Sequence, residues 1–290
     1  MSFILVDQIT QFDSGKSISG LKHISHSEPY LTRSHHSSKA IFIPSLIGEA
    51  TGQLAAWSVM HALDFKKRPV AGIVSKVNIL GEVFVGETLK LEATIDALDS
   101  EAVEYHGSAY VGDKKVFEIE SAIGPMVAMD EMISQSEVQG QFNQISHADL
   151  GNITSKSPLS DNSIQRNPLI MFDRILEMAQ KTETIAEKDI DLFASYFPDH
   201  FPLKPVLPLT MLLSCKIELV YDYLAHYFPN QLFLIESVQK IKMSQFVIPG
   251  EVLQTRMKVK EKEGLMLFQF KSFVSDKRVC VCEVVVKNNH

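Results

Sequence analysis

The chain has 290 residues, of which 45% are hydrophobic and 22% are charged, a composition typical of a soluble globular protein with one large domain or two of ordinary size. The net charge of −7 argues against general affinity for nucleic acid, and the sequence contains no apolar run of the roughly 18 residues that span a bilayer. The three cysteines, Cys215, Cys280 and Cys282, cannot form a disulfide framework and fit a reducing compartment. We therefore expect a cytoplasmic protein that binds neither nucleic acid nor membranes.

An internal repeat organises the chain. Gly86-Glu87 and Gly250-Glu251 stand in similar apolar contexts 164 positions apart (250 − 86), and each pair leads into an alternating segment typical of a β-strand. Two further pairs of similar segments have the same order in both copies and nearly the same offset. Residues 6–9 resemble residues 172–175, upstream of the Gly-Glu pairs, and residues 110–116 resemble residues 273–279, downstream of them. Because several markers share one order and one offset, we interpret the chain as two copies of one unit.

Both copies predict the same elements in chain order: a short opening strand, a long apolar helix and several antiparallel strands. The helices are expected at residues 45–63 and 209–228. Helices this apolar are normally buried, here inside a curved sheet. Between the copies, residues 131–163 are rich in Ser, Asn and Gln, which is typical of a linker, with room for one short helix.

The first helix carries a candidate functional acid, Glu49. Glu49 and Gln53 are four residues apart and therefore share one face of the helix. A carboxylate on so apolar a helix is costly unless it is paired or protonated. The alternative is a Glu49 that is salt-bridged or faces solvent.

The second helix is preceded by a proline-rich turn that carries one histidine, His200. Pro202, Pro205 and Pro208 fix φ and remove three N–H donors, so the turn has few conformations to choose from. A histidine held in this way can act as an acid or a base near neutral pH. The alternative is a surface histidine with no chemical role.

Three segments of the second copy carry a family resemblance: residues 172–177, residues 197–208 and residues 247–251. They resemble the bacterial β-hydroxyacyl-ACP dehydratases of the FabA/FabZ type, and the first copy is similar at residues 3–7, 28–30, 49–53 and 83–87. The resemblance implies the hotdog fold, an α+β fold in which an antiparallel sheet wraps around one long helix. Two units make a double hotdog, an internal pseudo-dimer. The implied division is an N-terminal hotdog at 1–130, a linker at 131–163 and a C-terminal hotdog at 164–290.

Sites in this family combine a histidine from the turn before the helix with a Glu or Asp six residues past the last proline of the motif. The second copy keeps the histidine, His200, but has Ser214 at the acid position. The first copy keeps the acid, Glu49, while its turn offers His35 or His36 without the Phe-Pro of the motif. Because family sites join two units, the resemblance implies one complete site, His200 with Glu49. It also implies a degenerate second site of His35, His36 and Ser214.

The implied activity is the reversible dehydration of 3-hydroxyacyl thioesters to trans-2-enoyl thioesters, in fatty-acid or polyketide-like biosynthesis. His200, with an ordinary pKa of about 6.5, would remove the C2 proton, and Glu49 would donate a proton to the leaving oxygen. Backbone N–H groups at the start of the second helix would stabilise the enolate-like oxygen. The acyl chain would lie in an apolar tunnel between the helices. The implied substrate-binding residues are Gln53, Val206 (whose carbonyl would orient His200), Pro208 and Leu209, which replaces the family's glycine.

The resemblance implies no cofactor and no metal, and it implies an acyl carrier protein or CoA thioester as partner. Family carriers are acidic, so a basic rim is expected, although each candidate has solvated surface charge as its alternative. The candidates are Lys66, Lys67, Arg68, Lys204, Lys240 and Lys242. Two other functions stay open: another hotdog thioester enzyme, such as a thioesterase or an isomerase, and a non-catalytic subunit that binds acyl carriers. A homodimer of whole chains is also left open.

Overall fold

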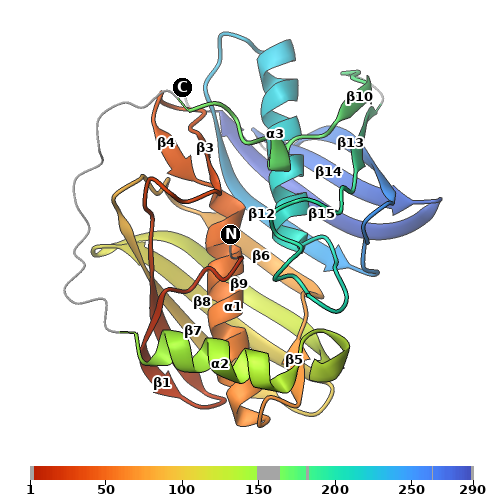
Figure 1. Cartoon of the computed structure of the whole chain (residues 1–290). Coiled ribbons are helices and arrows are strands. Elements are labelled where there is room, and N and C mark those ends of the chain that lie inside the picture. The colour runs from red at the N-terminus through yellow and green to blue at the C-terminus, as the bar shows by residue number, and fades with distance from the viewer. Residues whose placement is uncertain (1–2, 149–163, 181–182, 263, 289–290) are drawn as a thin grey trace.

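The computed structural model describes residues 3–148, 164–180, 183–262 and 264–288 (Figure 1). The elements of the N-terminal part are β1 (Gln8–Asp13), β2 (Ser17–His23), β3 (Leu31–Arg33), β4 (Ala40–Phe42), α1 (Pro44–Ala62), β5 (Lys67–Pro69), β6 (Ile73–Ile79), β7 (Thr88–Leu98), β8 (Ala102–Val111), β9 (Lys114–Ala128), η1 (Met129–Glu131) and α2 (Gln135–Ser146). Those of the C-terminal part are η2 (Pro168–Ile170), β10 (Arg174–Glu177), β11 (Thr184–Asp189), α3 (Leu209–Tyr227), β12 (Phe233–Met243), β13 (Val252–Lys262), β14 (Leu265–Val274) and β15 (Lys277–Asn288).

One antiparallel sheet runs through both parts of the chain, in the strand order β1-β2-β7-β8-β9-β6-β12-β15-β14-β13-β11-β10. The two parts meet where β6 pairs with β12, with Val77 opposite Val238 and Val74 opposite Ile241. Figure 1 shows the orange and yellow strands of the N-terminal part continuing through this pair into the blue strands of the C-terminal part. The sheet therefore fixes how the two parts lie relative to each other.

Each part of the sheet packs against one long helix, α1 or α3 (Figure 1). Pro44 opens α1, where its missing N–H costs nothing, and α3 starts directly after Pro208. Helix α1 contacts β2, β7 and β8. Helix α3 meets the C-terminal strands through Tyr223, whose ring packs edge-on against Phe268 of β14. Both helices are apolar around most of their circumference, which suits burial inside a curved sheet.

This architecture confirms the predicted fold, an α+β double hotdog in which each antiparallel sheet surrounds one long helix. The predicted helices at 45–63 and 209–228 agree with α1 and α3 to within one residue at each end. The two helices touch each other near their N-termini, where the hydroxyl groups of Ser45 and Ser214 are hydrogen bonded. The N-terminal ends of the helices thus come together between the two parts.

Helix α2 is the short helix for which the linker sequence leaves room. Its N-terminus is capped by Ser134, whose hydroxyl accepts a hydrogen bond from the backbone N–H of Glu137. Phe142 anchors α2 against Trp57 of α1 and against Phe65. Residues 149–163 of the predicted linker lie outside the described residues. No helix in the described ranges has both the length and the apolar character needed to cross a membrane.

Candidate active site

A cavity of about 180 Å³ lies between α1, α3 and the central strands of the sheet. Residues of α1, β5, β6 and β9 line it from the N-terminal part, and residues of α3, β12 and the proline turn line it from the C-terminal part. Most of the lining is apolar, with a few convergent polar groups: Ser45, Glu49, Gln53, Arg68, Tyr105, Gln141, Asp199, His200 and Thr210. A concave, apolar site with few polar groups is the usual form of a small-molecule site, and its walls suit an acyl chain.

His200 lies on the wall of this cavity, in the proline turn that precedes α3. Its Nδ1 is 3.0 Å from the backbone carbonyl oxygen of Val206. Because a carbonyl oxygen only accepts hydrogen bonds, Nδ1 carries the hydrogen, and Nε2 keeps a free lone pair. The imidazole is also held by rings, edge-on to Phe3 at 5.6 Å and stacked on Phe201 at 4.2 Å. The turn thus presents a fixed imidazole with one available nitrogen.

The protonation of His200 depends on its surroundings. Burial lowers the pKa of His200 below its ordinary value of 6.5, because the imidazolium loses its hydration, and the negative charge of Glu49 opposes this effect. The positive charge of Arg68 lowers the pKa further. The imidazole is therefore neutral at pH 7, which is the form that can accept a proton.

Glu49 projects from α1 into the same cavity. Its Oε2 accepts a hydrogen bond of 2.7 Å from the hydroxyl of Thr210 on α3, and its Oε1 accepts one of 3.0 Å from Nε2 of Gln53. Gln53 in turn accepts a hydrogen bond from the N–H of Leu5 and donates one to the carbonyl of Phe3. Both carboxyl oxygens of Glu49 are therefore held in place, one by each long helix.

The remaining expected substrate-binding residues lie at the start of α3. Val206 and Leu209 line the cavity, and Leu209 is 7% exposed. Pro208 is buried and caps the N-terminus of α3 without lining the cavity. The N–H groups of the first turn of α3 begin immediately after it, at the edge of the site.

One member of the expected basic rim lies elsewhere. Arg68, which the sequence pattern predicts on the rim, instead lines the cavity, and its guanidinium carbon lies 4.0 Å from the centroid of the Phe201 ring. The difference arises because side chains alternate along a strand, so adjacent basic residues on β5 do not share one environment. The side chains of Lys66, Lys204 and Lys240 are between 43% and 72% exposed.

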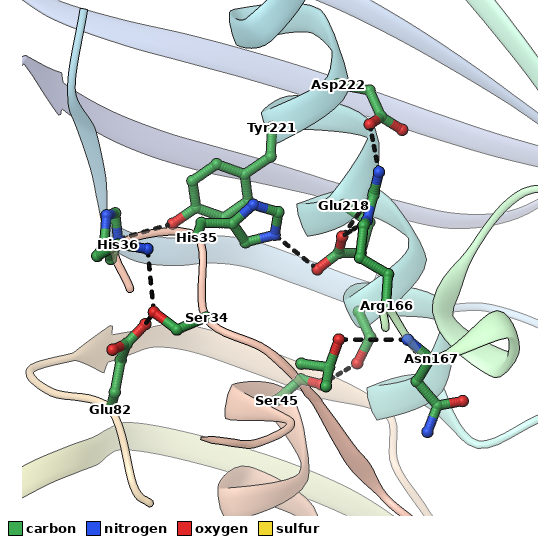
Figure 2. Close-up of polar contacts among 12 residues, drawn as sticks. Ser34, His35, His36, Ser45, Glu82, Arg166, Asn167, Glu218, Tyr221 and Asp222 are labelled. Atoms are coloured by element: carbon green, nitrogen blue, oxygen red, sulfur yellow. Dashed lines mark hydrogen bonds and ion pairs between the residues drawn. The ribbon is translucent and has the colours of Figure 1, made fainter. Parts of the chain in front are cut away.

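A second histidine–carboxylate pair lies where the segment before β4 meets α3 (Figure 2). Nε2 of His35 is 3.0 Å from Oε1 of Glu218, and the ring of Tyr221 stacks on His35 at 3.7 Å. The family pattern points to Ser214 as the counterpart of His35, but the hydroxyl of Ser214 bonds to Ser45 instead. Glu218 is four residues further along α3 and so lies on the same face, one turn away.

This second pair lies in a cluster of ion pairs and does not line the cavity. Arg166 donates from Nε to Oε2 of Glu218 and from Nη1 to Oδ1 of Asp222, both at 2.7 Å, as Figure 2 shows. His36 is exposed, with Nε2 3.4 Å from the hydroxyl of Tyr221. Arg166 therefore fills the space beside Glu218 with a partner of opposite charge.

The sequence analysis missed the roles of three polar residues at these two sites: Thr210, Glu218 and Arg68, which lines the cavity. Glu218 had a signal, because it stands four residues after Ser214 as Gln53 stands four after Glu49. Thr210 and Arg68 had none, because their roles depend on contacts between the two parts of the chain.

Comparison with known proteins agrees with this architecture. Residues 164–283 match the model of the FabA-like domain. The 3-hydroxyacyl-(acyl-carrier-protein) dehydratase FabZ of Clostridium kluyveri is 31% identical over 117 residues, which are 40% of this chain and 81% of the relative. The protein of the same name from Shewanella denitrificans is 24% identical over 149 residues, 49% of this chain and 94% of the relative.

Solved structures with the same fold match nearly the whole chain. The dehydratase domain of PpsC from Mycobacterium tuberculosis, in complex with C12:1-CoA, has a TM-score of 0.54 at 9% identity, and the match covers 100% of both chains. An acyl-ACP thioesterase from Bacteroides thetaiotaomicron has a TM-score of 0.52 at 10% identity, over 93% of this chain and 98% of the other. At such low identity these two likenesses concern the fold alone. Together with the sequence matches, they establish that the chain belongs to the FabA/FabZ-type family of 3-hydroxyacyl-ACP dehydratases, as a double hotdog.

Proposed function

We propose that the protein catalyses the reversible dehydration of 3-hydroxyacyl thioesters to trans-2-enoyl thioesters, with His200 as the base and Glu49 as the acid. In this proposal the unit at 164–290 supplies His200 and the unit at 1–130 supplies Glu49. The observation that carries it is the shared cavity: both side chains line it, and the hydrogen bond from His200 Nδ1 to Val206 leaves Nε2 free to take a proton.

The reaction requires two proton transfers. His200 Nε2 accepts the proton as the C2–H bond breaks, and the electron pair of that bond moves toward C1 and the thioester oxygen. The C2=C3 double bond then forms as the C3–O bond breaks, and Glu49 gives its proton to the departing hydroxide, which leaves as water. Hydration of the enoyl thioester is the same sequence in reverse. The hydrogen bonds from Thr210 and Gln53 hold the carboxyl group of Glu49 for this transfer.

The test is the hydration of a crotonyl thioester by the full-length protein. His200→Ala and Glu49→Gln are each expected to lower kcat by about 10²–10⁴-fold, because each removes one proton-transfer partner. The double variant is expected to be little slower than either single variant, since the two groups act as a unit. His35→Ala is the matched control: it removes a histidine paired with a carboxylate outside the cavity, and it should retain the parent rate.

Other outcomes would replace this proposal with one of its alternatives. Release of free thiol that depends on Glu49 but not on His200 would indicate a thioesterase, a class represented among proteins with this fold. A parent protein that binds acyl thioesters without converting them would indicate a non-catalytic carrier-binding subunit. Full activity of both His200→Ala and Glu49→Gln would place the chemistry elsewhere.

We infer that the acyl group arrives on an acyl carrier protein or on CoA. The proline turn bears Lys204, whose Nζ lies 5.5 Å from the centroid of the Phe246 ring and 3.5 Å from Glu131. A partly exposed lysine beside the cavity suits an acidic carrier or the phosphates of CoA. Comparing kcat/KM for the same acyl group on the two carriers, in the parent and in Lys204→Glu, tests this. A rate that responds to neither change would exclude a role for Lys204.

A further inference from the structure

Among the described residues that line the cavity, Arg68 is the one lysine or arginine. It is the central residue of β5, where its backbone pairs with Val127 of β9. Its neighbour Lys67 is turned elsewhere and donates from Nζ to the carbonyl of Ser100. The pairing with β9 therefore fixes the strand so that one basic side chain, and not its neighbour, enters the cavity.

The contacts of Arg68 place its charge at the reacting end of the cavity. Its guanidinium lies over the ring of Phe201 at 4.0 Å, a cation–π contact, and Phe201 also stacks on His200. The guanidinium and the imidazole are thus packed against the same aromatic ring. The charges of Arg68, Glu49 and His200 also act on one another, since Arg68 lowers the pKa of His200 and Glu49 opposes the lowering of the pKa of Arg68.

Arg68 has no fixed counter-ion among the described residues. Its Nε is buried without a hydrogen-bond partner there, and no carboxylate in those ranges forms an ion pair with it. The cavity's two carboxylates are engaged by other groups: Glu49 by Thr210 and Gln53, and Asp199 by the backbone N–H of Phe3. Burial lowers the pKa of Arg68 to about 10, with Glu49 opposing, so the guanidinium remains charged at pH 7. A partly buried cation without an ion-pair partner is costly, and an anionic ligand group would reduce that cost.

We propose that Arg68 is a further catalytic residue, whose guanidinium binds the thioester oxygen and stabilises the negative charge that develops there when His200 removes the C2 proton. This rests on the proposed function. The oxygen gains charge as the C2–H bond breaks and loses it again as the C3–O bond breaks and Glu49 protonates the leaving hydroxide. A preorganised cation in a water-poor cavity stabilises such transient charge strongly. Arg68 would add a full charge to the partial charge of the N–H groups at the start of α3.

The thioester oxygen is the favoured partner because the rest of the cavity offers an acyl chain apolar walls. Strands β6 and β12 contribute only aliphatic and thioether side chains to the lining: Ile73, Val74, Val77, Ile79, Val238, Ile241 and Met243. A polar group on the distal chain would find no partner on those strands. Arg68 lies instead over the ring of Phe201, on which His200 also stacks, at the end of the cavity where the reacting carbons must be.

The experiment compares Arg68→Met, Arg68→Lys and Arg256→Met in crotonyl-thioester hydration. Arg68→Met keeps the reach of the side chain without the charge, and kcat at the pH plateau is expected to fall about 10²–10³-fold. Arg68→Lys keeps the charge and is expected to recover part of that loss. Arg256 is the matched control, because it is an exposed arginine that packs over an aromatic ring, Phe273, outside the cavity. Arg256→Met should keep the parent rate.

Two further readouts separate catalysis from a structural role. The acid limb of the kcat/KM profile for dehydration of a 3-hydroxybutyryl thioester, the direction in which His200 accepts the proton, is expected to move to higher pH in Arg68→Met, because the positive charge that lowers the pKa of His200 is gone. Exchange of the C2 hydrogens of a butyryl thioester with deuterated water needs the base and the charge stabilisation but no leaving group. It is therefore expected to be lost in Arg68→Met and retained in Glu49→Gln.

The outcomes also distinguish this proposal from the proposed function. If the parent neither hydrates crotonyl thioester nor exchanges C2 hydrogens, the proposed function fails. If the parent does both and Arg68→Met and Arg68→Lys keep the parent kcat, the role of Arg68 fails alone. A rise in KM with an unchanged kcat would make Arg68 a chain-recognition residue and overturn the proposal. So would a loss of kcat/KM confined to acyl groups that carry a carboxylate. If Arg68→Met does not fold, a parent-like kcat of folded Arg68→Gln would overturn it as well.

Discussion

The hydroxyl of Thr210 donates a hydrogen bond of 2.7 Å to Oε2 of Glu49. The two residues belong to different halves of the pseudo-dimer, since Thr210 is in the first turn of α3 and Glu49 is on α1. The contact therefore ties the orientation of the proposed acid to the helix that follows the proposed base. It is a direct physical link between the two contributions to the cavity.

Replacing Thr210 with Val keeps the shape of the side chain and removes the hydrogen bond to Glu49. Loss of one such bond to a carboxyl group is worth about 1.5 kcal/mol, so kcat for crotonyl-thioester hydration is expected to fall roughly tenfold. Thr210→Ser keeps a hydroxyl at the same place and is expected to restore most of the rate. Equal rates for the parent and Thr210→Val would show that the contact does not contribute to catalysis.

The pH profile follows from the direction of the pKa shift at His200. Burial lowers this pKa below 6.5, so the neutral base persists into mildly acidic solution. The acid limb of kcat/KM for dehydration of a 3-hydroxybutyryl thioester, the direction in which His200 accepts the proton, is therefore expected below pH 6.5. Dehydration rates measured in buffers of constant ionic strength test this direction. An acid limb above pH 6.5 would contradict a neutral, desolvated imidazole.

The cluster around Glu218 is expected to matter for stability and not for the reaction. Glu218→Gln leaves Arg166 with a weaker partner and is expected to lower the free energy of unfolding by about 1–3 kcal/mol, measured by urea denaturation. Its kcat for crotonyl-thioester hydration should equal that of the parent, because Glu218 does not line the cavity. Glu236→Gln, at an exposed position on β12, is the control and should change neither quantity. A large loss of kcat in Glu218→Gln would instead indicate a second working site.

The acyl-chain preference is expected to depend on the wall formed by β6. Val74 lines the cavity, so Val74→Phe fills part of it and should lower kcat/KM for an octanoyl-length substrate at least about tenfold relative to crotonyl thioester. Ser75→Phe is the matched control, because the adjacent residue is exposed and does not line the cavity. Equal losses for short and long substrates in Val74→Phe would place the chain along another wall.

The organisation into two units could be predicted because its signals are local and occur twice, and the resemblance to the FabA/FabZ-type dehydratases then implied the hotdog fold for each unit. The Gly-Glu pairs at 86–87 and 250–251 and the two apolar segments mark corresponding places in both units, and each apolar segment is long enough to identify one helix. The pairing of β6 with β12 had no such signal. Many strands of similar apolar character can pair, and only the packed structure selects Val77 to face Val238.

The candidate site was predictable only as far as its motif extends. His200 and Glu49 stand in recognisable surroundings, a proline turn and an i, i+4 acid–amide pair. Thr210 acquires its role from the approach of α3 to α1, a distance that a single sequence does not contain. Arg68 follows two lysines, and only the register of β5 on β9 decides which of the three side chains enters the cavity.

The β6–β12 pair also changes how the site depends on protein concentration. In a dimer of separate chains, a cavity lined by both subunits disassembles when the protein is diluted below its dissociation constant. Here the two linings belong to one chain, so each half experiences the other at an effective concentration that dilution cannot change. The cavity stays assembled at the lowest abundance, and each half is free to change a residue without the same change appearing in its partner.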